Sequence, residues 1–186
     1  MISTELFIVI AIVCCVPLWV IGVYNRFVML RNLVDSVWAQ TEVQLRRRYD
    51  LIPNLVEAVK GYATHERETF EKVIQARNTA MNATTPEAIA GAENALTGTL
   101  KSLFAVAEAY PELKANQNFT ALQQELTTTE GFIAECRSHF NNTVLAFNNA
   151  LEVFPANLVA TAFRFQPRGF FGVPDGVARE PVKVQF

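Results

Sequence analysis

Histidine and cysteine are scarce in this 186-residue chain, which contains two histidines and three cysteines. Neither His65 nor His139 has a glutamate three residues before it, as the Glu-x-x-His pairs of di-iron bundles require. Cys14 and Cys15 lie in an apolar run and Cys136 on an apolar helical stripe, so no disulfide framework or thiol cluster is visible. No Ser-His-acid pairing or Gly-rich phosphate loop is present either. We therefore expect no enzymatic activity, no catalytic residue, no cofactor and no metal site.

Strong net charge is also missing. The formal net charge is −2, which creates no field that would attract nucleic acid, so we expect no nucleic-acid partner. The charge is unevenly spread, however. Residues 24–80 carry 9 Lys/Arg against 7 Asp/Glu, a net +2, whereas residues 81–154 carry 3 against 8, a net −5. This asymmetry suits helices that pack antiparallel, or copies that pack head to tail.

The most prominent feature that is present is an uncharged run over residues 6–25, LFIVIAIVCCVPLWVIGVYN. As a helix it would span about 30 Å, which is the hydrocarbon thickness of a bilayer. Trp19 and Tyr24 lie toward one end, where aromatic rings favour the membrane interface. The residues before the run include Glu5 and no Lys or Arg, unlike the start of a signal peptide. The sequence therefore predicts a retained transmembrane helix.

Basic residues flank this predicted span on one side only. Arg26 and Arg31 follow it closely, and no basic side chain precedes it. The positive-inside rule then places the N-terminus outside and the body of the protein in the cytoplasm.

Beyond the span, the apolar residues follow a helical period nearly throughout. Steps of three and four residues predict a first bundle helix over residues 26–81 that continues directly from the membrane helix. Thr85 before Pro86 fits an N-cap followed by an N1 proline, and Thr84 with Glu87 also fits a capping box. A second helix should therefore begin here.

Prolines mark the remaining helix ends. We expect Pro111 to stop the second helix, and a third helix to run from Phe119 to Phe154 and to end at Pro155. Short connections make neighbouring helices antiparallel. The predicted fold class is all-α: an N-terminal transmembrane helix continuing into an elongated, coiled-coil-like antiparallel helical bundle, with a Phe-rich irregular C-terminal tail. The predicted division is an N-terminal tail (1–5), transmembrane helix (6–25), helical bundle (26–154) and aromatic tail (155–186).

A first helix of this length would project beyond its partners toward the membrane. The projecting part carries an apolar stripe formed by Leu30, Val34 and Val37. Because its own chain would not cover this stripe, we expect contact with neighbouring copies of the protein.

The tail concentrates four phenylalanines among Pro and Gly residues: Phe163, Phe165, Phe170 and Phe171. Their spacing is not that of a helical stripe, and four exposed phenylalanines would favour aggregation. The tail therefore either folds back onto its own bundle or docks on another chain.

Three adjacent arginines, Arg46, Arg47 and Arg48, precede a proline in the first helix. Pro53 lacks an N–H and clashes with the carbonyl four residues earlier, which predicts a kink or a fresh helix start at residues 50–53. In one interpretation Arg46 and Arg47 are solvated, and Arg48 pairs with an acidic residue of the second or third helix. In the other, the cluster is a joint between subunits or a lipid-headgroup contact; the joint is favoured because a straight helix puts the cluster about 30 Å beyond the membrane.

Several longer motifs carry a family resemblance. They are WAQTEVQLRRRYDLIPNLVEAVKGYATHE at residues 38–66, YPELKANQNF at 110–119, ELTTTE at 125–130 and FPAN at 154–157. Together they resemble the signature of the bacterial LemA family, and the resemblance extends to the strand-like PVKVQF at 181–186. It implies an inner-membrane protein with one N-terminal span and an antiparallel helical-bundle body. Related proteins are linked to envelope and internal-membrane organisation, including magnetosome formation, and no catalytic residues carry over.

The leading hypothesis is a membrane-anchored scaffold of the bacterial inner membrane that forms homo-oligomers and organises or shapes the bilayer or other membrane proteins. The alternative is an adaptor that presents its bundle or tail to a membrane protease or secretion component.

Overall fold

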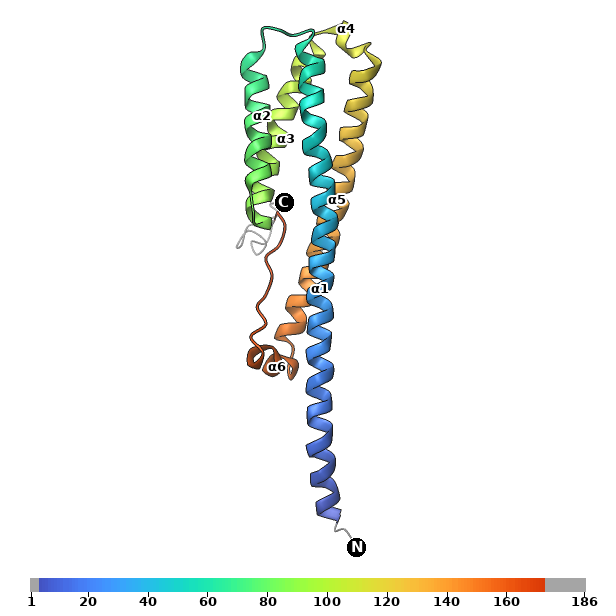
Figure 1. Ribbon diagram of the computed structural model, residues 1–186, viewed down its shortest axis with the longest axis vertical. Coiled ribbons are helices and arrows are strands. Elements are labelled where there is room, and N and C mark those ends of the chain that lie inside the picture. Colours follow the sequence, from blue (N-terminus) through green and yellow to red (C-terminus); the bar gives the residue numbers. More distant parts are fainter. Residues whose placement is uncertain (1–3, 173–186) are drawn as a thin grey trace, which may run out of the picture. The chain divides into compact units, whose positions relative to one another are not determined.

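The computed structural model describes residues 4–172. Most of the predicted N-terminal tail and the whole strand-like segment at 181–186 therefore lie outside the described residues. Within the described range there are six helices and no strand, which confirms the predicted all-α fold class (Figure 1). The helices are α1 (Thr4–Lys60), α2 (Arg67–Asn82), α3 (Pro86–Glu108), α4 (Pro111–Lys114), α5 (Gln117–Glu152) and α6 (Ala156–Ala162).

The chain divides into two compact units, and α1 and α5 contribute to both. We call the first the anchor unit; its described part comprises residues 4–38 and 142–168. The second, the bundle unit, comprises residues 39–141 and 169–172. Whether the division into tail, span, bundle and aromatic tail describes functional domains stays a prediction.

The first bundle helix was predicted to extend to residue 81, and this C-terminal end is wrong. α1 ends at Lys60, the chain reverses through residues 61–66, and α2 is a separate helix that packs against α3. Gly61 favours this break, because glycine is a poor helix former. The spacing of apolar residues did not reveal the break, because α1 and α2 each bury an apolar side in the same unit and the helical spacing therefore continues on both sides of it. Val59 at the end of α1 and Val73 in α2 are both completely buried.

The other helix ends agree better with the sequence. Thr85 is the N-cap of α3: its side-chain oxygen accepts a hydrogen bond from the Ala88 N–H at 3.2 Å, and Pro86 occupies the first turn. This confirms the first of the two capping alternatives. α3 ends at Glu108, and Pro111 begins the short helix α4. α5 ends at Glu152, two residues before the predicted end.

The core of the bundle unit is made of large aliphatic side chains from α1, α2, α3 and α5. Each of these helices buries one stripe with the spacing of a helix face. The most completely buried members are Ile52, Leu55, Val59, Val73, Leu96, Leu100, Leu103 and Leu126.

Pro53 lies inside α1 without ending it, so of the two alternatives predicted for residues 50–53, a kink or a fresh helix start, the fresh helix start is wrong. A proline at this position leaves the carbonyl four residues earlier, that of Tyr49, without its helical N–H donor. The Nε of Arg77, on α2, donates a hydrogen bond to this carbonyl oxygen at 2.7 Å. A side chain of the neighbouring helix therefore supplies the donor that the proline lacks, which is how the helix continues through it.

This arrangement predicts an energetic coupling between Pro53 and Arg77. Arg77→Ala leaves a part-buried carbonyl unpaired and should cost about 1–3 kcal/mol of unfolding free energy. In a Pro53→Ala background the new N–H can bond the same carbonyl, so Arg77→Ala should cost distinctly less. A double-mutant cycle on chemical unfolding of the detergent-solubilised chain measures the coupling.

Asn78→Ala is the matched control, because the Asn78 side chain is the other hydrogen-bond partner of Arg77, at 3.3 Å on the surface. It should change stability little in either background. Equal losses for Arg77→Ala with and without Pro53 would contradict this account of the proline.

Candidate membrane-interface site

The apolar side chains of α1 from Val13 to Ile21 are mostly exposed. In the described part of the chain, α1 is the one helix long and apolar enough to cross a membrane, and only 6% of its most apolar stretch is buried. Val13, Val16, Leu18 and Ile21 are all more than half exposed. A core helix of a soluble protein would bury such residues, whereas a bilayer provides the environment they need.

Aromatic rings gather where this apolar stretch ends. We call Tyr24, Phe27, Arg31, Phe163 and Phe165 the aromatic collar. The Tyr24 ring lies 4.9 Å from that of Phe163 and 5.6 Å from that of Phe165, between centroids. The Phe165 ring also lies 5.2 Å from the buried Phe27 ring, and the Arg31 guanidinium lies 5.8 Å from its centroid. The collar thus joins the tail to α1 at the predicted membrane boundary.

The end of α6 directs Phe165 toward α1. Arg164 has φ 57°, in the left-handed region, and follows the C-cap Phe163. The Phe165 N–H bonds to the Ala160 carbonyl at 2.9 Å, and the Arg164 N–H bonds to the Thr161 carbonyl at 3.2 Å. These two bonds make a Schellman motif, in which glycine is the usual left-handed residue. The predicted irregular tail therefore contains a short, capped helix.

Polar contacts hold the next part of the tail. The Arg168 backbone N–H and carbonyl exchange two hydrogen bonds with the Asn148 side chain, both at 2.9 Å. The Arg168 guanidinium pairs with Asp35 at 3.0 Å on the surface. Thus the anchor unit fixes the tail to residues from both α1 and α5.

Further along, the bundle unit buries the end of the described tail. Phe171 is completely buried, and Asn141 bonds to its backbone N–H at 2.8 Å and its carbonyl at 3.0 Å. The Arg137 guanidinium lies 4.7 Å from its ring centroid. Of the two alternatives for the tail, folding back onto its own chain is the one observed for its described part, residues 155–172. Phe165 and Phe170 are half-buried, and Phe163 remains 53% exposed.

The predicted projecting stripe is not free. Val34 and Val37 are each 2% exposed, and Leu30 is half-buried, so the argument that other copies must cover them is wrong. The error came from the helix lengths. Because α1 ends at Lys60, its portion after residue 25 is about as long as α5, which has 36 residues. The chain thus has enough helix to cover the stripe, and the end of α5 belongs to the same unit as residues 4–38.

The three arginines have three different environments. Arg46 is exposed, and Arg47 pairs with Glu125 at 3.0 Å on the surface. Arg48 is buried and pairs with acidic residues of two later helices, as the first of the two interpretations of the cluster expected. Its Nη1 donates to Glu93 of α3, and its Nη2 donates to Glu130 of α5 at 3.0 Å.

The buried cluster around Arg48 contains two more groups. Nη2 also donates to the Thr97 hydroxyl at 2.8 Å, so the planar guanidinium bonds to three side chains on two helices. Burial, followed by the nearby Glu93 carboxylate, raises the pKa of Tyr49 above its usual range. The Tyr49 hydroxyl therefore stays protonated and can donate to that carboxylate. The cluster holds α1, α3 and α5 of the bundle unit together.

Glu93 was not predicted as a core residue, although its position in the sequence indicates one. Glu93 lies four residues after Ile89 and three before Leu96, on the buried stripe of α3. A single carboxylate at a core position needs a buried cation as a partner. Arg48 falls on the continuation of the apolar side of α1, and its position indicated that it could be this cation.

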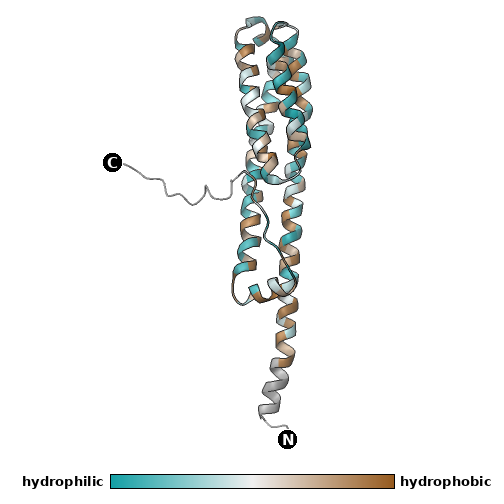
Figure 2. Ribbon diagram, turned by 90° about the vertical axis from the view of Figure 1, so that its left-hand side faces the viewer, coloured by the Kyte–Doolittle hydropathy of each residue, from teal (hydrophilic) through white to brown (hydrophobic). Residues whose placement is uncertain are grey.

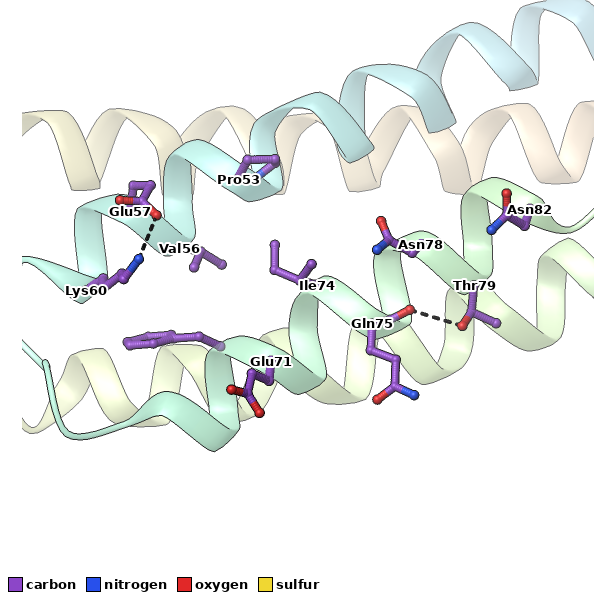
Figure 3. A pocket seen from close by; sticks show the side chains of 11 residues that line it. Pro53, Val56, Glu57, Lys60, Glu71, Ile74, Gln75, Asn78, Thr79 and Asn82 are labelled. Carbon is purple, nitrogen blue, oxygen red and sulfur yellow. Dashed lines mark hydrogen bonds and ion pairs between the residues drawn. The ribbon is translucent and has the colours of Figure 1, made fainter.

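The bundle unit also has an open groove of about 640 Å³ between the end of α1 and α2 (Figure 3). Pro53 and Val56 of α1 and Phe70 and Ile74 of α2 line it. In the part of the chain that is described, no three His, Cys, Asp or Glu side chains gather as metal ligands would, in the groove or elsewhere.

These features define a class: over residues 4–172 the protein is helical, with one apolar helix suited to anchoring it in a membrane. The model of the LemA family matches residues 37–186, and the chain belongs to this family.

Individual relatives extend the comparison. The chain is 24% identical to Protein LemA of Metamycoplasma hominis, over 75% of this chain, and 22% identical to the magnetosome protein MamQ of Magnetospirillum gryphiswaldense, over 80% of it. MamQ 2 of Paramagnetospirillum magneticum is similar to the same extent. The match spans 64% of the length of each relative. With the uncovered apolar stretch of α1, these similarities indicate a membrane-associated protein.

The buried cluster predicts a large difference between neighbouring arginines. Arg48→Ala should cost about 3–5 kcal/mol of unfolding free energy, because it leaves the Glu93 carboxylate buried without its cation. Arg47→Ala, the control, removes a surface pair and should cost at most about 1 kcal/mol. Replacing Arg48 and Glu93 together by Met and Leu should recover most of the loss, since Glu130 is solvated. Chemical unfolding followed by circular dichroism compares the variants; equal losses for Arg47→Ala and Arg48→Ala would contradict the assignment.

Proposed function

We propose that this protein is a non-enzymatic scaffold of the bacterial inner membrane, which self-associates and organises the bilayer or other membrane proteins around it. Its partners would be the lipid bilayer, further copies of the chain and, through them, other membrane proteins. The similarity to a magnetosome protein supports a role in membrane organisation.

The observation that carries this proposal is an exposed apolar pair on α1. Met29 is 66% exposed and Leu33 is 47% exposed, and they lie one helical turn apart in the anchor unit. Ser36 continues this spacing and is also exposed. Steps of four and then three residues are those of a helix–helix seam. This seam differs from the predicted one, whose valines are buried.

A second copy is the occupant that best fits this seam. Copies anchored by α1 in one membrane point in the same direction and are confined to two dimensions. Their seams therefore lie at the same height, and a parallel pair brings Leu33 opposite Leu33. Such a self-complementary contact has two-fold symmetry and can form without any additional protein.

We further propose that the N-terminus lies outside and the bundle unit in the cytoplasm. Arg26 and Arg31 follow the apolar stretch directly, in support of this orientation. A C-terminal tag should then resist protease added to spheroplasts and become sensitive after lysis. Loss of the tag in unlysed spheroplasts would reverse the orientation.

The groove of the bundle unit favours a second candidate function. Its four apolar lining residues, Pro53, Val56, Phe70 and Ile74, lie among polar ones, and such a groove could receive a segment of a membrane protease or secretion component, as an adaptor would. An adaptor needs no second copy of itself. The two functions therefore differ in the state of association of the chain.

Cysteine cross-linking in native membranes tests the scaffold. In a chain whose native cysteines are replaced by serine, Leu33→Cys should give an oxidised dimer as a major product. Asn32→Cys is the matched control, because Asn32 is exposed on the same helix but points about 100° away. It should form several-fold less dimer.

Equal cross-linking at the two positions would indicate random collision and would contradict a specific seam. A chain that cross-links at neither position, and that is purified as a monomer with one stoichiometric partner, would support the adaptor instead.

A further inference from the structure

A second apolar surface adjoins the aromatic collar and shares Phe163 with it. It is formed by α6, the turn that precedes it and its C-cap residue. Phe154 is 75% exposed, Leu158 is 62% exposed, and Val153 and Phe163 are each more than half exposed. We call these four side chains the α6 apolar face. The opposite side of α6 is buried through Val159 and Ala160. The helix is therefore held against its unit by one side while it presents large apolar groups outward on the other.

This surface is level with the expected membrane boundary. The Tyr24 ring contacts that of Phe163, and Tyr24 is the last aromatic residue of the uncharged run that ends at residue 25. Figures 1 and 2 both place α6 beside α1 within the anchor unit. A bilayer that covers α1 as far as Tyr24 therefore reaches the α6 apolar face as well.

The anchor unit that carries this face has a small excess of basic residues, which suits anionic lipid headgroups. The described part of the anchor unit beyond residue 12 contains four arginines and two acidic residues, a net +2, whereas the chain as a whole is at −2. The arginines are Arg26, Arg31, Arg164 and Arg168, and the acids are Asp35 and Glu152. Basic groups beside a partly buried apolar helix are characteristic of segments that lie in the membrane interface.

We propose that α6 and its preceding turn form a second lipid contact, which lies in the interface of the leaflet where α1 leaves the membrane. Leu158 and Phe154 enter the boundary between headgroups and acyl chains, and Arg164 faces the phosphates. The occupant of the α6 apolar face is thus the bilayer.

The consequence is a membrane attachment with two points instead of one. A single helix can tilt and rotate within a bilayer, because lipid tails contact every side of it equally well. A second contact on one side of α1 restricts its rotation, since α6 must stay at the surface. It would give the anchor unit a defined rotational orientation about the axis of α1 relative to the membrane. This inference needs only the membrane anchor and is independent of self-association.

Site-directed spin labelling of the full chain in liposomes containing phosphatidylglycerol tests the proposal. The native cysteines are replaced by serine, and a nitroxide is attached at Leu158→Cys. Collision rates with oxygen, which concentrates in lipid, and with a water-soluble nickel chelate report the surroundings of the label. We expect the oxygen-to-nickel ratio at Leu158→Cys to be several-fold higher than at Leu145→Cys, an exposed position on α5 in the same unit.

Val16→Cys, in the apolar stretch of α1, gives the ratio for a label in lipid. A label at Leu158→Cys that is as accessible to nickel as the one at Leu145→Cys would overturn the proposal, since the face would then be in water. Low access to both reagents, with dipolar broadening that disappears on dilution with unlabelled chain, would also overturn it, because a second copy would then cover the face. Circular dichroism checks that each labelled chain keeps its helix content.

Discussion

A helix that leaves the hydrocarbon of a membrane must keep its backbone hydrogen bonds paired up to the point where water can satisfy them. α1 meets this constraint by continuing as one helix from the apolar stretch to Lys60. The rest of the described structure depends on this continuity. Each unit is built on a different part of the same helix: the anchor unit takes residues up to Trp38, and the bundle unit takes those from Ala39 onward.

Two residues of α1, Pro53 and Arg48, need partners that other helices of the bundle unit supply. Pro53 leaves a carbonyl without a donor, and Arg77 supplies one. Arg48 carries its charge into the core, where Glu93 and Glu130 neutralise it. Buried polar groups of this kind contribute little net stability, yet a wrong helix register would leave them unpaired at high cost. We therefore interpret them as the groups that determine how α1, α2, α3 and α5 align.

In the anchor unit, the contacts place the tail next to the apolar stretch of α1. The Schellman motif at Arg164 turns the chain, and Phe165 then packs against Tyr24 and Phe27. Phe154 and Leu158 of the same unit remain exposed. Large exposed apolar side chains of this kind are unfavourable in water, and contact with a bilayer would remove that cost.

Local chemistry allowed much of the fold to be predicted from the sequence. The uncharged run, the N-cap at Thr85 and the end of α5 before Pro155 depend on neighbouring residues only, and all three are found where expected or within two residues. The reversal after Lys60 was missed because a helical period continues unchanged on both sides of it. That one error made the first helix seem too long and assigned Val34 and Val37 to a surface between copies. The exposed positions Met29 and Leu33 could not be identified, because periodicity shows that a helix has an apolar side without showing which side its own chain covers.

The sequence by itself determined that this chain is helical, that its N-terminal helix suits a bilayer and that it belongs to the LemA family, since composition, spacing and motif identity depend only on residue order. Only the tertiary structure decided which arginine is buried, which phenylalanines are covered and which apolar face is left uncovered. These outcomes depend on contacts between residues far apart in the chain, such as Arg48 with Glu130 or Tyr24 with Phe163. The chain has to fold before such residues meet, and until then each one has several equally plausible partners.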